Sequence, residues 1–169
     1  MESTDKRYKV LKEDLNNADP NKLKAIINSL RNETVIPGII LLLKDIMEDC
    51  DNDQVLTELT SFLNDLKDQS LATEVIEAIE TTKSDLVQQK LIASCWQSGL
   101  DYSGHLDHFI DYSIKLSYLA TLECYSVIEE WANEADENSK TIWRKSLQLS
   151  LNDQSKEKKN LIKAIISLL

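Results

Sequence analysis

Two histidines lie three residues apart near the start of an expected helix, a spacing that can serve metal chemistry. His105 and His108 are the only histidines of the chain, and Asp101, Asp107 and Asp111 are their neighbours in sequence. Residues at i and i+3 share one face of a helix, so two imidazoles and a carboxylate could bind zinc. The pair lacks a Glu or Cys at the fixed spacing of zinc motifs, and histidines on an exposed helix are mostly surface residues. We therefore expect no metal site here.

A second acidic stretch, Glu48 to Asp53, places carboxylates at alternate positions as calcium loops do. In a calcium loop that began at Asp49, the sixth residue would be glycine and the twelfth glutamate. The chain has Gln54 and Thr60 there, so both the sharp turn and the bidentate ligand are missing. The stretch is predicted to be a polar loop that contains a helix cap.

Catalytic motifs are also missing from the sequence. It contains no Gly-x-Ser-x-Gly, no glycine-rich phosphate loop, no Cys-x-x-Cys and no His-Glu-x-x-His. Each of these would supply an activated nucleophile, a phosphate cradle, a redox pair or a zinc site. Because only two histidines occur, few side chains can exchange protons near neutral pH. The sequence predicts a noncatalytic protein without a cofactor.

Aromatic side chains suggest two candidate protein-binding elements. In the string from Cys95 to Ser103, Trp96 and Tyr102 could offer amphipathic contact area to a partner. The alternative is structural: Cys95 and Trp96 pack in the core, Gly99 permits a left-handed turn after a helix, and Ser103 caps the next helix. The sequence leaves both interpretations open and favours the structural one.

The second element is an acidic run around Trp131. It could dock a basic segment, with the indole as the aromatic anchor; the alternative is a solvated loop. Its acidic residues are Glu129, Glu130, Glu134, Asp136 and Glu137.

The charge is concentrated in the middle of the chain. The net charge is −10, from 19 basic and 29 acidic residues. Residues 51–150 hold 7 basic and 18 acidic side chains, a net charge of −11. An acidic surface repels phosphate, so nucleic acid and anionic membranes are excluded as expected partners. A protein partner with a basic segment fits better.

The elements that must position these residues are expected to be helices. Three glycines and two prolines are too few to punctuate many strands, so the composition favours an all-α fold. Asp19-Pro20 reads as an N-cap followed by proline at the first helical position, and Pro37 is predicted to begin a helix in the same way. Ser70 is a further expected N-cap. The longest aliphatic run, Ile39 to Leu43, is far shorter than the roughly 20 residues of a membrane span.

Apolar stripes recur along the chain at a nearly constant period and are predicted to pack in the core. Besides the residues aligned below, they include Leu86, Leu91, Leu119, Leu122, Ile142, Leu149 and Ile165. Leu30, Leu63, Trp96 and Ile128 align at steps of 33, 33 and 32 residues. A helix pair cannot bury both of its apolar faces alone, so this period predicts a right-handed α-α superhelix of about four hairpins. We expect one domain over 1–169, with units at 19–50, 51–82, 83–116 and 117–151 and flanking helices at 4–16 and 155–169.

The first unit resembles HEAT-like repeats of the short bacterial type. The segment Val35–Asp45 follows the stripe Ile26–Leu30 and has the pattern Ile-Pro-x followed by two aliphatic residues, with Lys44-Asp45 at its close. Later units depart from the motif, with Leu71-Ala72-Thr73 and Gly104-His105-Leu106 at the corresponding places, so tetratricopeptide-like or irregular α-α arrays stay open. The likeness covers residues 19–151.

The resemblance implies a binding scaffold and brings no catalytic motif with it. Some HEAT-like proteins excise alkylated bases from DNA, which needs a basic groove, and others attach bilin chromophores to phycobiliproteins. A bilin lyase-type activity is therefore the alternative to a scaffold. For the scaffold, the expected contact residues are Glu129, Glu130, Trp131, Glu134, Trp96 and Tyr102.

The remaining expectations concern compartment and oligomeric state. Cys50, Cys95 and Cys124 are odd in number and widely spaced, as is typical of small buried residues in a reducing compartment, and no secretory signal is apparent. We expect a cytosolic protein. The apolar helix 155–169 would be exposed if nothing capped it, so a monomer or a weak homodimer through the terminal helices is expected.

Overall fold

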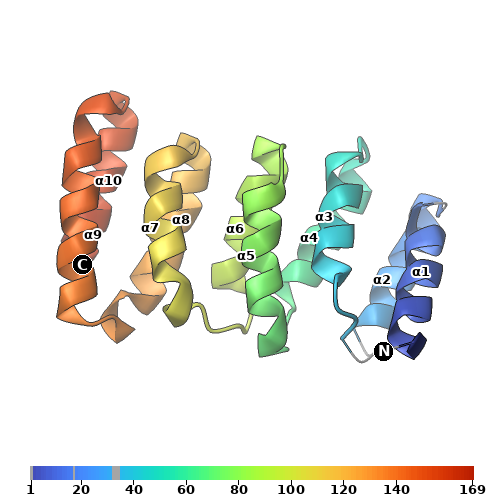
Figure 1. Ribbon diagram of the computed structural model, residues 1–169. Helices are drawn as coiled ribbons and strands as arrows, with labels where there is room; N and C mark the ends of the chain where they lie inside the picture. Colours follow the sequence, from blue (N-terminus) through green and yellow to red (C-terminus); the bar gives the residue numbers. More distant parts are fainter. Residues whose placement is uncertain (1, 17, 32–34) are drawn as a thin grey trace. The chain divides into compact units, whose positions relative to one another are not determined.

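The computed structural model describes residues 2–16, 18–31 and 35–169, and the side chains of residues 2–5 and 16 are left out of the description. Throughout these residues the regular structure is helical, as the composition predicts (Figure 1). The chain forms two compact units, Met1–Leu100 and Asp101–Leu169. The expectation of one repeat domain over the whole chain stays a prediction.

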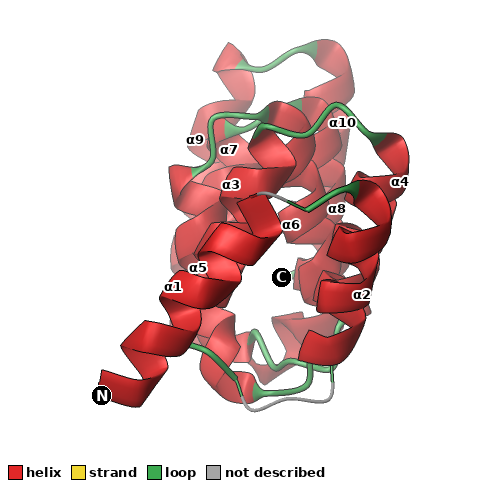
Figure 2. Ribbon diagram, turned by 90° about the vertical axis from the view of Figure 1, so that its right-hand side faces the viewer, coloured by secondary structure: helices red, strands yellow, loops and turns green. Residues whose placement is uncertain are grey.

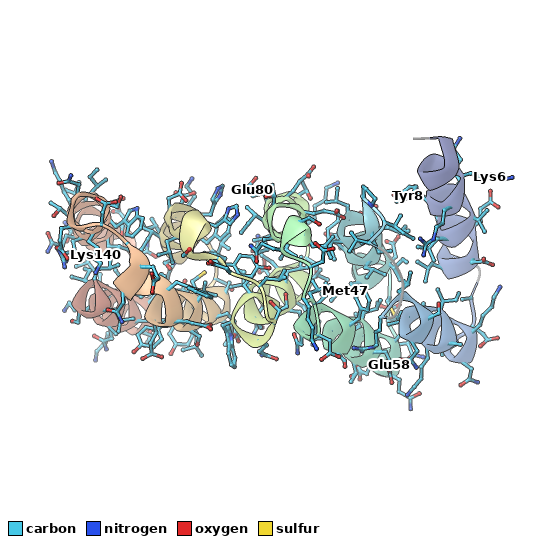
Figure 3. The ribbon with its side chains drawn as sticks, turned by 90° about the horizontal axis from the view of Figure 1, so that it is seen from below. Lys6, Tyr8, Met47, Glu58, Glu80 and Lys140 are labelled. Carbon is cyan, nitrogen blue, oxygen red and sulfur yellow. The ribbon has the colours of Figure 1, made fainter. Side chains whose placement is uncertain are left out.

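The first unit contains two rows of helices. One row is formed by α1 (Glu2–Asn16), α3 (Ile39–Glu48) and α5 (Ala72–Thr81), and the other by α2 (Pro20–Leu30), α4 (Asp53–Asn64) and α6 (Asp85–Gln97). Each helix packs against the next helix of its own row. Figure 2 looks along the rows from the side of α1 and α2. Met47 lies between the rows, whereas Glu58 and Glu80 point outward from opposite rows (Figure 3). Alternate helices of the sequence therefore form the two faces of this unit.

Side-chain hydrogen bonds join equivalent positions of neighbouring helices within a row. The Lys24 Nζ atom lies 2.5 Å from the Glu58 carboxylate, across 34 positions of sequence. The Asn64 amide donates to the Gln97 amide oxygen at 2.6 Å, across 33 positions. These separations match the predicted period of 32 or 33 residues to within two positions.

The start of α3 differs from the prediction at Pro37. The helix begins at Ile39, two residues later, so Pro37 is not its first helical residue. A turn is formed by the four residues from Ile36 to Ile39. The Ile39 N–H donates a hydrogen bond to the Ile36 carbonyl at 3.1 Å. Gly38 has φ +85° and ψ 0°, which are the values of the third residue of a type II turn. Proline at the second position and glycine at the third favour this turn. Pro37 therefore lies in the turn and not at the helix start.

The backbone N–H groups at this helix start are satisfied by a neighbouring helix. The Glu74 carboxylate of α5 accepts from the backbone N–H groups of Gly38 at 3.1 Å, Ile40 at 2.6 Å and Leu41 at 3.3 Å. The first N–H groups of a helix have no partner within the helix, and the positive end of its dipole attracts an anion. Glu74 therefore replaces the local N-cap that α3 lacks.

A second carboxylate joins the same two helices at their other ends. Glu48, at the end of α3, accepts from the Thr82 hydroxyl at 2.5 Å and from the Lys83 backbone N–H at 2.6 Å, just after α5. Burial acts to raise the pKa of Glu48, but these hydrogen bonds and the nearby Lys44 ammonium lower it below its ordinary value. Lys44 is itself buried and lies 2.7 Å from the Asp45 carboxylate. Glu48 and Glu74 thus fasten α3 and α5 at both ends.

The second unit contains α7 (Leu106–Lys115), α8 (Tyr118–Trp131), α9 (Glu137–Ser150) and α10 (Lys156–Leu168). α7 packs against α8 and α9, and α10 packs against the same two helices. Short 3-10 turns precede α7, follow α8 and follow α9. The unit is therefore an assembly of four helices in which α7 and α10 each contact both α8 and α9.

Buried polar groups close the end of α7. The Lys158 Nζ atom donates to the carbonyls of Ile114 at 2.8 Å and Leu116 at 2.6 Å, and the Thr121 hydroxyl lies 3.2 Å from the Ser113 carbonyl. The last carbonyls of a helix lack partners within the helix and form the negative end of its dipole, so an ammonium group suits this position. Burial lowers the pKa of Lys158.

Local capping confirms some predictions and corrects others. Asp19 caps α2 with Pro20 at its start, as predicted. Asp68, not Ser70, is the N-cap of the 3-10 turn before α5, because its carboxylate accepts from the Ser70 N–H. The left-handed residue expected at Gly99 is wrong, since Gly38 is the one described glycine with positive φ. Five further helices of the described chain, α4, α6, α8, α9 and α10, begin with a side-chain cap, which is supplied by Asn52, Ser84, Ser117, Asp136 and Ser155.

Most residues of the predicted apolar stripes are buried or half-buried, and six are exposed. Leu63, Leu91, Ile128 and Ile165 are fully buried in the two units. Several expected core residues are instead exposed because their helices bury a different face; these are Leu86, Trp96, Leu119, Leu122, Ile142 and Leu149. Cys95 and Cys124 are buried as predicted, and burial raises the pKa of Cys124 to about 12, whereas Cys50 is only half-buried.

The terminal apolar helix is covered to a large extent within its own unit. Ile162, Ile165 and Leu169 are buried, and Leu161 and Leu168 are half-buried. The apolar side chains most exposed in this unit are on α8 and α9. Association through the terminal helices stays a prediction.

Candidate protein-interaction surface

Two of the predicted contact residues lie in different units. Trp96 is on α6 of the first unit and is 39% exposed, so it is not the core residue of the structural alternative. Tyr102 belongs to the second unit and is fully buried, with its ring edge-on to the Phe109 ring at a centroid distance of 5.9 Å. A buried ring has no surface to offer a partner, so Tyr102 is a core residue and the binding role predicted for it is wrong.

The predicted acidic run spans the end of α8, the 3-10 turn that follows it and the start of α9, where Asp136 is the N-cap and Glu137 the first residue. Glu129, Glu130 and Glu134 are exposed, whereas Trp131 is half-buried. At 100° per residue, Trp131 lies about 200° round the helix from Glu129, on the opposite side. Its indole N–H is buried and has no acceptor among the described residues. The structure therefore exposes the three carboxylates and does not place Trp131 beside Glu129 as an anchor.

The exposed side of α8 also carries apolar residues that sequence reasoning assigned to the core. Tyr118 is 43% exposed, Leu119 52% and Leu122 41%. They are spaced i, i+1 and i+4, so they lie together on one side of the helix. The side facing the core is instead formed by small and branched residues, namely Ala120, Thr121, Cys124, Val127 and Ile128. A helical wheel of residues 118–131 places apolar residues on both sides of α8, so it does not decide which side packs.

We refer to this exposed side as the α8 face. It is formed by Tyr118, Leu119, Leu122, Tyr125, Ser126, Glu129 and Glu130. Its first half is apolar and its last turn is acidic. At a rise of 1.5 Å per residue, roughly 14 Å along the helix axis separates the centre of the apolar part from the two carboxylates.

The acidic end of the α8 face is ordered by a hydrogen bond. The Tyr125 hydroxyl donates to the Glu129 carboxylate at 3.1 Å, and this bond raises the pKa of Tyr125. Partial burial raises the pKa of Glu130, because desolvation disfavours the charged carboxylate. A cation that approached Glu130 would stabilise its charged form and lower that pKa.

The electrostatics of α8 favour a cation. Over its described length, Tyr118–Trp131, the helix contains Glu123, Glu129 and Glu130 and no Lys or Arg. Glu129 and Glu130 lie in the last turn, where the negative end of the helix dipole adds to their charge. The α8 face can therefore bind a group that is apolar at one end and basic at the other.

The residues considered for metal chemistry have other roles in the structure. The His105 and His108 rings lie 6.0 Å apart in a series of aromatic contacts that includes Tyr102 and Tyr112. Within the described parts of the chain, no three His, Cys, Asp or Glu side chains converge as a metal site would require. In the loop considered for calcium, Asn52 caps α4, which confirms the prediction of a polar loop with a helix cap.

The first unit contains a hollow of about 480 Å³. Its walls are mainly apolar and include Leu30, Ile36 and Phe62. Arg31 stands at its edge, paired with Asp65 and with its guanidinium carbon 5.8 Å from the centroid of the Phe62 ring. The apolar walls suit an apolar group. The Arg31 guanidinium at the edge is already paired with Asp65.

Comparison with models of protein families, with curated proteins and with solved structures finds no significant match to this chain. The resemblance to HEAT-like repeats stays a prediction. In the portion of the chain that the structure describes, every helix is too short or too polar to cross a bilayer.

Proposed function

We propose that this chain is a noncatalytic protein-interaction scaffold, a superhelical array of helix pairs that binds its partner through an acidic helical surface. The α8 face is the observation that carries the proposal. Soluble proteins seldom leave neighbouring large apolar side chains exposed unless a partner covers them. Here Leu119 and Leu122 are exposed beside a carboxylate-rich helix end.

The repeated contacts of the first unit support the array. Glu74 and Glu48 reach across 34 positions to the neighbouring element, and Lys24 reaches Glu58 across the same separation. A row of helices joined by hydrogen bonds between residues one repeat apart would form an extended surface. Repeat proteins use such surfaces to bind other proteins. The net charge of −11 over residues 51–150 favours a partner with a basic segment.

Affinity capture with the full chain tests the scaffold. The tagged protein is incubated with a lysate of its source cell at low and at high salt, and bound proteins are identified by mass spectrometry. We expect a specific protein partner whose retention falls with salt and with Glu130→Lys, because the substitution reverses a charge on the binding surface.

Glu77→Lys is the matched control, since Glu77 is an exposed glutamate on α5. The control is expected to retain the partner. A partner that is retained equally by both variants and at both salt concentrations would contradict the electrostatic part of the proposal. No specific partner from the source cell would contradict the scaffold itself.

A further inference from the structure

The α8 face is apolar at one end and acidic at the other, and this order restricts which partner segment can bind it. Tyr118, Leu119 and Leu122 form the apolar half, and Glu129 and Glu130 form the acidic end. A partner that paired with both halves at once would need apolar side chains and basic side chains separated by roughly 14 Å along its own length.

We infer that the α8 face binds an amphipathic segment of a partner protein whose apolar anchors and basic residues are grouped in separate blocks. This inference rests on the proposed scaffold function and adds the chemistry of the segment. Its apolar block covers Leu119 and Leu122, and its Lys or Arg block lies over Glu129 and Glu130. A helical segment spans the distance in about nine or ten residues, and an extended one in about four.

Charge complementarity selects this occupant over others. α8 has three glutamates and no Lys or Arg along Tyr118–Trp131, so an acidic segment would meet like charge at the helix end. Anionic lipid headgroups and nucleic-acid phosphates would meet the same repulsion. A purely apolar segment would cover Leu119 and Leu122 but would provide no basic group to pair with Glu129 and Glu130.

The hydrogen bond between Tyr125 and Glu129 positions one carboxylate of the acidic end. The Tyr125 hydroxyl donates to the Glu129 carboxylate at 3.1 Å, which orients that carboxylate on the helix surface. Glu130 lies one position further on, and partial desolvation raises its pKa. A basic side chain placed here therefore finds one oriented carboxylate and one whose charge it would itself stabilise.

Two designed peptides test the inference on the full chain. The block peptide has 18 residues, with leucines on one helical face of its first half and lysines in its second half. The mixed peptide has the same composition, with lysines distributed evenly. Fluorescence anisotropy of the labelled peptides should show about tenfold tighter binding of the block peptide, and higher salt should reduce this difference.

Substitutions in the protein locate the binding site. Leu122→Ser and Glu130→Lys should each weaken binding of the block peptide about fivefold or more. Leu149→Ser and Glu77→Lys are the matched controls, because both side chains are exposed on other helices, and they should change binding less than about twofold. Circular dichroism confirms that each variant keeps its helical content.

Equal binding of the two peptides, or equal effects of the Leu122 and Leu149 substitutions, would overturn the inference. If light scattering shows a dimer that Leu122→Ser abolishes, a second copy of the chain covers the α8 face and the inference is also wrong. The scaffold proposal is tested separately by lysate capture. A captured partner whose retention depends on Glu130, together with equal binding of both peptides, would leave the scaffold standing and remove only the block arrangement.

Discussion

Glu74 caps a helix that lies 34 positions earlier in the chain: its Oε1 atom is 2.6 Å from the backbone nitrogen of Ile40. The same carboxylate also accepts from the N–H groups of Gly38 and Leu41. α3 has no side-chain cap of its own, since its N-cap residue is Gly38. The cap of one helix pair is thus supplied by the next, which couples their stabilities.

Removing this carboxylate should destabilise the first unit. Glu74→Ala leaves the N–H groups at the start of α3 without an acceptor, and the expected loss in free energy of unfolding is about 1–3 kcal/mol. Urea denaturation followed by circular dichroism measures it. Glu77→Ala on the same helix is the control and should change stability by less than about 0.5 kcal/mol. Equal effects of the two substitutions would show that the cap contributes little.

Gly38 should not accept a side chain. Its φ of +85° is costly for an L-residue, and a Cβ atom there would lie 3.1 Å from the Tyr8 ring. Gly38→Ala should therefore cost about 1–2 kcal/mol, measured by thermal and urea unfolding. Gly104→Ala is the control, because a Cβ atom at Gly104 has open space. The prediction fails if the two alanine variants are equally stable.

Glu48 should make the first unit sensitive to acid. Its pKa lies below its ordinary value of 4.5, so the folded state binds the Glu48 proton more weakly than the unfolded state does. The stability it contributes is present above pH 4.5 and is lost as the pH falls through the lowered pKa. Urea unfolding from about pH 6 to about pH 3 should show a smaller decrease for Glu48→Gln than for the parent chain.

The control for this experiment is Asp49→Asn, since Asp49 follows Glu48 in the sequence and its side chain is exposed. It should retain the acid sensitivity of the parent chain. Identical pH profiles for Glu48→Gln and the parent chain would contradict the role assigned to Glu48.

Burial separates two leucines that the sequence places equally in apolar stripes. Leu63 on α4 is 0% exposed and Leu149 on α9 is 70% exposed. Leu63→Ala should cost roughly 2–5 kcal/mol, because it removes contacts and leaves a cavity. Leu149→Ala should change stability by less than about 0.5 kcal/mol. Thermal midpoints of both variants check the difference, and a negligible shift for Leu63→Ala would contradict its place in the core.

The helices themselves could be predicted because their signals are local. Asp19-Pro20 marks the start of α2 through a cap and a fixed φ, and both depend only on neighbouring residues. The period that relates Leu30 to Leu63 also appears in the sequence, and the structure uses the same separation when Asn64 meets Gln97. Pro37 was placed wrongly because proline also fits the second position of a type II turn when glycine follows it.

The candidate surface could be predicted only in part. The acidic residues Glu129 and Glu130 were identified from charge, and the structure leaves them exposed. Leu119 and Leu122 were assigned to the core, because an apolar residue in a helical stripe is usually buried. α8 has apolar residues on both sides, so its sequence does not decide which side packs.

The sequence by itself determined the helical class of the fold, the repeat period and the concentration of acidic charge, since composition, spacing and charge are properties of the chain alone. The tertiary structure decided which face of each helix is buried and which residue completes each helix end. Ile40 and Glu74 are 34 positions apart, and Ile114 and Lys158 are 44 apart. These pairs meet only after neighbouring helices pack, because the packing that buries one face of α8 or α5 also fixes what its other residues can reach.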